Sequence, residues 1–95
     1  MAIAGLGGLG SSIAVNLARA GVGHLHLVDF DRVDLTNLNR QQYFIRHLGL
    51  YKTDALRQEL LDINPYLDVR TDCVKVTAVN LQELFAGAEI ICEAF

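Results

Sequence analysis

The chain has 95 residues, of which 52% are apolar and 20% charged, and its net charge is −3. This length and balance are typical of one small globular domain and exclude two. The acidic excess argues against a nucleic-acid-binding surface, which needs clustered basic residues, and no apolar run reaches the roughly 20 residues that cross a bilayer.

The first half of the chain predicts a strand, a glycine-rich turn, a helix and a second strand. Their predicted ranges are 2–5, 5–10, 9–20 and 24–29. The helix is indicated by an i, i+4, i+8 stripe of Leu9, Ile13 and Leu17, and Gly21 stands where a glycine commonly ends a helix. A flexible linker is excluded, because the glycines stand between a predicted strand and a predicted helix.

The second half predicts two more helix–strand pairs, after residues 30–50, which show no strong period. The predicted ranges are a helix at 51–63, a strand at 67–76, a short helix capped by Thr77, and a strand at 89–94. The first of these helices carries Leu56, Leu60 and Ile63 on one face. Alternating units of this kind predict an α/β, Rossmann-like fold with four mostly parallel strands and helices on both faces of the sheet.

The glycine-rich turn predicts a nucleotide site. Gly5, Gly7 and Gly10 fit the G-x-G-x-x-G pattern, and Gly8 adds another position without a Cβ. In that pattern the first glycine makes the turn, the second lets the backbone approach phosphate, and the third packs the helix on the strand. Asp29, 19 residues after Gly10, stands where a carboxylate binds ribose hydroxyls; the alternative is that it caps the turn that follows it. These features do not decide which nucleotide binds.

Polar residues after the second strand favour a highly charged ligand. Asn37 and Arg40 supply amide and guanidinium donors, and Lys52 opens a helix, where the dipole disfavours a cation unless an anion is near. Two cations and a helix N-terminus suit a triphosphate better than the diphosphate of NAD. Three alternatives stay open: a turn cap for Asn37, a surface ion pair of Arg40 with Asp31 or Asp34, and a solvated Lys52.

Five segments together resemble the ThiF/MoeB/HesA family, which is related to the ubiquitin-activating enzymes. They are GLGGLGS, LARAGVGHLHLVDFD, NLNRQ, LGLYK and INP, and they cover nearly the whole chain in order. The form NLNRQQYF is most similar to ThiF-like members of thiamine biosynthesis. The resemblance implies adenylylation, with Mg-ATP, of the C-terminal carboxylate of a ubiquitin-like sulfur-carrier protein in thiamine or molybdopterin biosynthesis.

The resemblance also implies a role for each site residue. Gly8 would lie against the ATP phosphates, Asp29 would hold the ribose, and Asn37 would bind the phosphate region. Arg40 and Lys52 would neutralise charge on the phosphates, which makes them the candidate catalytic residues. No side chain of this chain is expected to ligate the metal, because the aspartate that serves Mg-ATP in the family would be the next residue after the last one.

We therefore expect residues 1–95 to be one Rossmann-like nucleotide-binding domain, part of a longer adenylating domain and incomplete for turnover. The resemblance further implies a homodimer, and the absence of a signal-like or bilayer-spanning segment predicts a cytoplasmic protein. Two other functions stay open. They are an NAD(P)-binding domain of an oxidoreductase and a non-catalytic interaction module.

The cysteines and histidines are predicted to be structural. Cys73 and Cys92 are far apart and outside any C-x-x-C pair, so two buried core thiols are expected. The three histidines, His24, His26 and His47, have no second ligand at metal-binding spacing. Neither a metal site nor a catalytic histidine is therefore expected.

Overall fold

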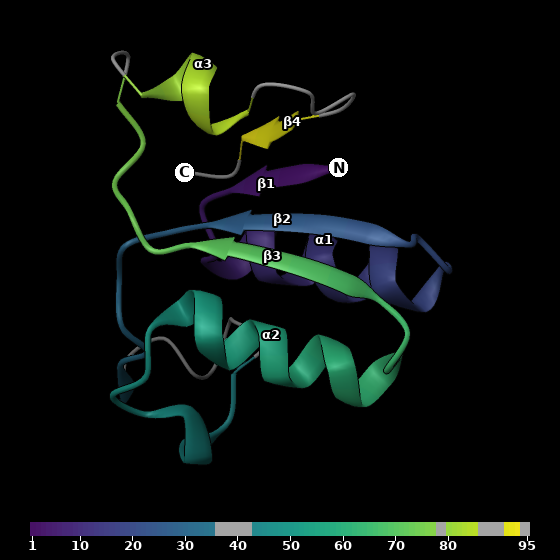
Figure 1. The fold of residues 1–95 in the computed structure, drawn as a ribbon. Helices are drawn as coiled ribbons and strands as arrows, with labels where there is room; N and C mark the ends of the chain where they lie inside the picture. The colour runs from purple at the N-terminus through teal and green to yellow at the C-terminus, as the bar shows by residue number, and fades with distance from the viewer. Residues whose placement is uncertain (36–42, 78–79, 86–90, 94–95) are drawn as a thin grey trace.

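Four parallel strands form one sheet in the computed structural model, in the order β3-β2-β1-β4 (Figure 1). The strands are β1 (Ala2–Ala4), β2 (His24–Val28), β3 (Asp68–Asp72) and β4 (Ile91–Glu93). The helices are α1 (Gly8–Arg19), α2 (Lys52–Ile63) and α3 (Leu81–Leu84), with a 3-10 turn at Ile45–His47. The structure describes residues 1–35, 43–77, 80–85 and 91–93.

The strand order places the direction change of the sheet between β1 and β4. From β1, the chain adds β2 and then β3 on one side, whereas β4 pairs with the other edge of β1. Ligands of open parallel sheets bind outside the carboxyl ends of the strands at such a switch point. The predicted α/β fold with four strands is confirmed, and it directs attention to the edge where β1 and β2 end.

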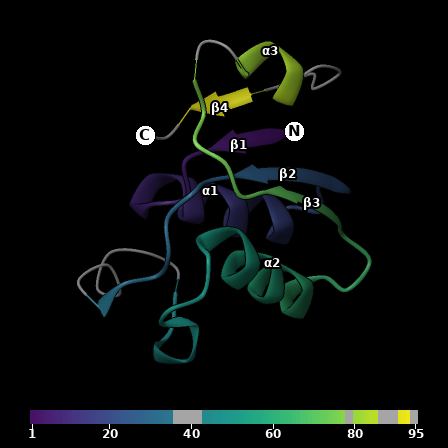
Figure 2. The same ribbon diagram turned by 60° about the vertical axis from the view of Figure 1, so that its left-hand side comes forward.

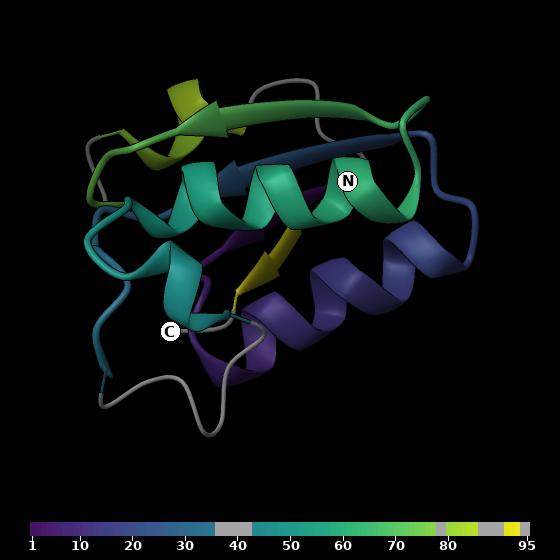
Figure 3. The same ribbon diagram turned by 90° about the horizontal axis from the view of Figure 1, so that it is seen from below.

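Two separate apolar clusters cover the two faces of the sheet. On one face, Ile3, Leu25 and Leu27 pack against residues of α1 and α2, and these two helices lie side by side in Figure 3. On the other face, Val28 packs with Phe85, which follows α3. Figure 2 shows α3 on the opposite side of the strands from α2. Helices on both faces, as the sequence predicts, are therefore confirmed.

Small residues, and not the leucine stripe, form the buried face of α1. The buried positions are Gly10, Ser11, Ala14, Val15 and Ala18, whereas Leu9 is exposed and Ile13 and Leu17 are only partly buried. The stripe predicts the helix correctly but does not mark the side that meets the sheet. Residues without bulky side chains let the helix backbone lie close to the strands, and this requirement outweighs hydrophobicity here.

Two local signals in the sequence concern the end of α1, at Gly21, and the start of α3, at Thr77. Gly21 adopts φ +90°, and the N–H of Val22 donates to the carbonyl of Leu17 at 3.1 Å, which closes α1 with the hydrogen bond of a Schellman motif. Before α3, the Thr77 hydroxyl accepts from the N–H of Asn80, and the Asn80 side chain accepts from the N–H of Thr77. This reciprocal pair closes a turn before α3; because α3 begins at Leu81, the predicted cap of the helix by Thr77 stays a prediction.

The prediction of two core thiols is wrong for Cys73. Its side chain is exposed immediately after β3, because β3 ends at Asp72, four residues earlier than the alternation predicts. The side chain of Cys92 lies outside the described residues. Within the described ranges, no helix is long and apolar enough to cross a membrane.

Candidate functional site

The candidate site lies at the carboxyl ends of β1 and β2, where the glycine-rich turn leads into α1. Gly5 adopts φ +92°, a left-handed conformation that favours glycine, and its N–H donates to the carbonyl of Val28 at 2.9 Å. The turn is thereby fixed to the end of β2. The predicted role of the first glycine, which is to make the tight turn, is confirmed.

The carboxylate of Asp29 lies against the glycine turn. One oxygen accepts the N–H of Leu6 at 2.6 Å, and the other accepts the N–H of Asp31 at 2.8 Å. The side chain is almost covered, with 6% of its surface exposed. Asp29 therefore caps the turn that follows it, as the alternative prediction states, and it also binds the glycine turn. A carboxylate has about four acceptor positions, so the two bonds leave capacity for a ribose hydroxyl.

The N-terminus of α1 offers backbone donors without competition from a side-chain cap. Gly7 is the N-cap residue and supplies no side chain, and the first turn contains no acidic residue. The first intrahelical bond joins the N–H of Ser11 to the carbonyl of Gly7 at 3.0 Å. The N–H groups of Gly8, Leu9 and Gly10 precede it and have no acceptor inside the helix. With the positive end of the helix dipole, they are suited to an anion.

Tyr43 is a site residue that the sequence did not indicate. Its hydroxyl donates to the carbonyl of Leu6 at 2.6 Å, and its side chain is 4% exposed. Burial raises the pKa of the Tyr43 phenol above its ordinary value of 10, and the charges of Asp29 and Glu59 raise it further. No sequence signal distinguishes this tyrosine from an ordinary core aromatic, because its partner is a backbone carbonyl 37 residues away.

Lys52 is placed at the same end of the sheet by a backbone pairing. The backbone N–H of Lys52 donates to the carbonyl of Asp31 at 2.9 Å. The guanidinium of Arg32 donates to the carbonyl of Gly49 at 2.8 Å. The Lys52 side chain is 7% exposed, and its Nζ lies 3.9 Å from a carboxylate oxygen of Asp31. The alternative of a solvated lysine is therefore wrong. Asp31 therefore pairs with Lys52, whereas its predicted pairing with Arg40 stays a prediction, because Arg40 lies outside the described residues.

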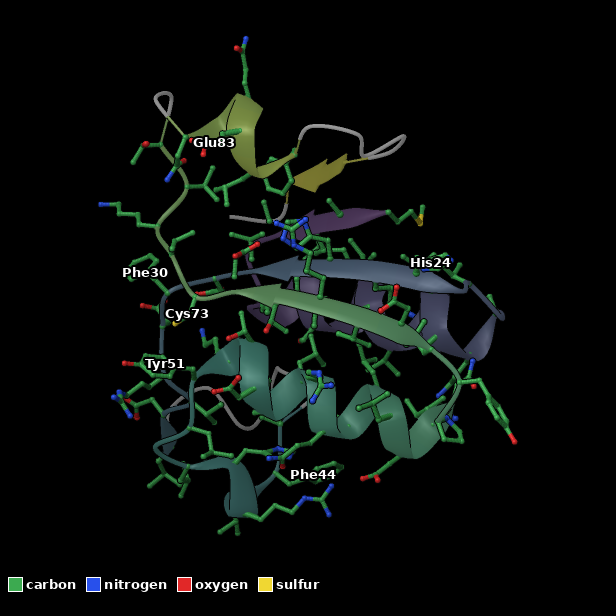
Figure 4. The ribbon with its side chains drawn as sticks, viewed as in Figure 1. His24, Phe30, Phe44, Tyr51, Cys73 and Glu83 are labelled. Carbon is green, nitrogen blue, oxygen red and sulfur yellow. The ribbon has the colours of Figure 1, made fainter. Side chains whose placement is uncertain are left out.

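A half-exposed aromatic ring and an exposed lysine extend the site beyond Asp29. Phe30 follows Asp29 directly, and the Nζ of Lys75 lies 5.9 Å from the centre of its ring. In Figure 4, Phe30, Cys73 and Tyr51 appear at the end toward which β2 and β3 point, and His24 at the other end. The candidate site thus combines backbone donors, a carboxylate, a lysine and an aromatic surface.

Asn37 and Arg40 lie outside the described residues, so their predicted roles stay predictions. The histidines have structural partners: His24 pairs with Asp68 at 3.0 Å, His26 pairs with Asp72 at 2.5 Å, and the Nδ1 of buried His47 accepts the N–H of Phe44 at 2.9 Å. Among the residues that the structure describes, no group of three His, Cys, Asp or Glu side chains could hold a metal ion.

An open hollow of about 430 Å³ lies at the opposite end of the domain. It is lined by Ala18, Arg19, Gly21, Ile63 and Asn64, where α1 and α2 end. The hollow shares none of these lining residues with the glycine turn, Asp29 or Lys52. It is therefore separate from the candidate site.

The sequence matches known proteins along its whole length. A model described as "ThiF family" matches residues 1–95. The chain is 41% identical over 88 residues to the ubiquitin-like modifier-activating enzyme 5 of Oryza sativa subsp. japonica, covering 93% of this chain and 21% of that protein. It is 38% identical over 94 residues to the molybdopterin-synthase adenylyltransferase of Haemophilus influenzae, covering 98% of this chain and 39% of that protein.

Solved structures agree with these sequence matches. The E. coli tRNA N6-threonylcarbamoyladenosine dehydratase TcdA, crystallised in complex with AMP, superimposes with a TM-score of 0.96 at 33% identity. That match covers 99% of this chain and 39% of TcdA. The complex of TcdA with ATP gives a TM-score of 0.94 at 34% identity, covering 99% of this chain and 40% of TcdA. The chain thus spans between a fifth and two fifths of the proteins that it matches.

Proposed function

Because the chain belongs to the ThiF family, we propose that it binds ATP and serves in adenylylation of the C-terminal carboxylate of a ubiquitin-like carrier protein. The observation that carries this proposal is the uncapped N-terminus of α1 beside the carboxylate of Asp29. The first group suits phosphates and the second suits ribose hydroxyls. The AMP and ATP complexes of TcdA support the proposal, because their fold is the same.

The proposal assigns described residues at the carboxyl ends of β1 and β2 to the three parts of ATP. The phosphates would approach the N–H groups of Gly7 and Gly8, and the ribose would take the free acceptor positions of Asp29. The half-exposed ring of Phe30, next in the chain, would contact the base. The Lys52 ammonium has three donors, and its 3.9 Å separation from Asp31 is longer than a hydrogen bond, so donors remain for a phosphate. Arg40 is proposed as the second cation, as the resemblance implies.

In the proposed reaction, a carboxylate oxygen of the carrier attacks the α-phosphorus of ATP. A new oxygen–phosphorus bond forms, the bond between the α-phosphorus and the bridging oxygen breaks, and pyrophosphate leaves with the bonding electrons. The residues of this chain would orient the α-phosphate and neutralise the charge that develops on the leaving group. No side-chain nucleophile is needed. Mg²⁺ is proposed as the metal of the ATP, and the described residues contain no group of three His, Cys, Asp or Glu side chains that could hold it by themselves.

We propose that the carrier is a sulfur-carrier protein of thiamine or molybdopterin biosynthesis. We also propose that the enzyme is a homodimer and acts in the cytoplasm. The molybdopterin-synthase adenylyltransferase among the relatives supports a sulfur carrier. The modifier-activating enzyme among them supports the broader class of ubiquitin-like partners. The net charge of −3 disfavours a nucleic-acid partner.

Exchange of labelled pyrophosphate into ATP tests this proposal. We expect exchange to be slow with the 95-residue chain alone and to rise when a ubiquitin-like carrier with a free C-terminal carboxylate is added. The matched control is the same carrier ending in an amide, which has no oxygen nucleophile of the required kind and should give no increase. Equal stimulation by the acid and the amide would contradict the proposal. Arg40→Ala and Lys52→Met should both lower the carrier-dependent rate, by about tenfold or more.

A further inference from the structure

We propose that Tyr43 is a positioning residue for the nucleotide phosphates, because its hydroxyl fixes the peptide that joins Leu6 to Gly7. This inference rests on the proposed function, since it assigns Tyr43 to the ATP site described above. Tyr43 itself would not touch the nucleotide. It would act through the backbone of the glycine turn, by setting the direction of the Gly7 N–H.

The Leu6 residue is held from both sides. Its N–H donates to the Asp29 carboxylate at 2.6 Å, and its carbonyl accepts the Tyr43 hydroxyl at 2.6 Å. Both bonds are buried, and the Leu6 side chain is fully covered in the core. A buried bond to a charged acceptor is stronger than an exposed neutral one. The middle of the turn is therefore anchored at Leu6 to β2 and to the segment that carries Tyr43.

The planarity of the peptide carries this anchor to Gly7. In a trans peptide, the carbonyl and the following N–H point in opposite directions, and the structure contains no cis peptide among its described residues. The Leu6 carbonyl points toward the buried Tyr43 hydroxyl. The N–H of Gly7 must therefore point away from Tyr43, and in this proposal it faces the anion that the first N–H groups of α1 would bind.

Without such an anchor, the peptide between Leu6 and Gly7 would have an alternative orientation. Glycine adopts positive and negative φ with similar ease, so a glycine turn can rotate a peptide plane at little cost. Rotation would present the Leu6 carbonyl, an acceptor, to a phosphate. The Tyr43 hydroxyl opposes this, since the rotated state would bury an unpaired hydroxyl. The rigid ring is itself held edge-on by His47, at 6.2 Å between centroids and 90° between planes.

The test is an NMR titration of the ¹⁵N-labelled chain and its Tyr43→Phe variant with ATP and, separately, with adenosine. The phenylalanine keeps the ring and removes only the hydroxyl. We expect the variant to bind ATP about tenfold more weakly, the equivalent of one hydrogen bond, and adenosine with unchanged affinity. The matched control is Tyr66→Phe, which removes a hydroxyl from an exposed tyrosine and should leave both affinities unchanged.

An unchanged ATP affinity in Tyr43→Phe, or an equal loss for ATP and adenosine, would overturn the inference, since a purely structural role has no reason to act on the phosphates alone. A wild-type chain that binds no ATP would instead overturn the proposed function. If Tyr43→Phe does not fold, the titration of the wild-type chain with ATP still tests the inference. ATP should move the Gly7 amide resonance strongly and that of Gly23 little, whereas ATP binding with an unmoved Gly7 amide would overturn the inference.

Discussion

Asp29 combines a structural and a proposed binding role in one carboxylate. Its two oxygens accept the N–H groups of Leu6 and Asp31, so the residue that would hold ribose also holds the glycine turn in place. This explains why its side chain is nearly covered before any ligand is added. A change at this position is expected to affect stability as well as nucleotide affinity.

Asp29→Asn is predicted to lower the free energy of unfolding by about 1–3 kcal/mol. The amide keeps the size of the side chain, but its NH₂ group would face one of the two backbone donors. Asp68→Asn is the matched control, because the Asp68 side chain is exposed and pairs with the exposed His24 at 3.0 Å. Urea unfolding at pH 7 measures the free energy of unfolding of both variants. Equal, small losses in the two variants would show that the Asp29 bonds do not stabilise the turn.

Glu59 is a buried carboxylate at the contact of α2 with the rest of the core. Its side chain is 9% exposed, and its Oε2 has no hydrogen-bond partner among the described residues. Burial raises its pKa above the ordinary value of 4.5, against the opposing effect of Arg46 and Arg19. The native state therefore binds this proton more tightly than the unfolded state, and stability is lost as the pH rises through the native pKa.

Glu59→Gln is predicted to raise the free energy of unfolding at pH 7 by about 1 kcal/mol, because it removes a buried charge at constant side-chain size. Below pH 4.5, where the glutamate is protonated in both states, the gain should disappear. Urea unfolding at pH 4 and pH 7 provides the comparison. A variant that is less stable than the wild type at pH 7 would mean that Glu59 has a favourable partner.

At the scale of elements, the end of α1 depends on one left-handed residue. Gly21 has φ +90°, and a Cβ added there would meet nothing within 4 Å. Gly21→Ala should therefore lower the free energy of unfolding by about 1–2 kcal/mol through backbone strain alone. Gly23→Ala is the matched control, since Gly23 also has open space around it but no positive φ. Thermal unfolding that shows no difference between the two variants would contradict this account.

The 3-10 turn Ile45–His47 depends on a neutral imidazole. The Nδ1 of His47 accepts the N–H of Phe44, and burial, followed by the charge of Arg46, lowers the pKa of His47 below its ordinary value of 6.5. The unfolded state thus binds the proton more tightly, so this contribution is complete above pH 6.5 and is lost as the pH falls toward the native pKa.

His47→Gln is predicted to lower stability at pH 7.5 and to reduce the loss that the wild type shows between pH 7.5 and pH 5. His24→Gln, on the exposed end of β2, is the control and should keep most of that loss. Unfolding free energies of the three proteins at both pH values decide the matter. An equal loss of unfolding free energy between pH 7.5 and pH 5 in His47→Gln and the wild type would show that His47 does not cause the pH dependence.

For the whole molecule, patterns in sequence predict the order of elements better than the contacts between them. The alternation of strands and helices, the glycine turn and Asp29 are local signals, and they indicate the fold and the site. The anchor of Leu6 by Tyr43 and the pairing of Lys52 with Asp31 join residues distant in sequence or depend on chain geometry. Hydrophobicity alone does not say which side of an element is covered, as the exposed Leu9 of the helical stripe shows, and the burial expected for Cys73 is wrong because β3 ends before it.

The central claim is that the edge formed by the glycine turn, Asp29 and Lys52 binds ATP. Isothermal titration of the chain with Mg-ATP and with NADH tests it most directly, on the wild type, on Lys52→Met and on the control Arg57→Met, which removes an exposed cation from the same helix. We predict binding of ATP that weakens about tenfold in Lys52→Met only, and no comparable binding of NADH. Binding of NADH that is unchanged in both variants would contradict the claim and favour a dinucleotide-binding domain.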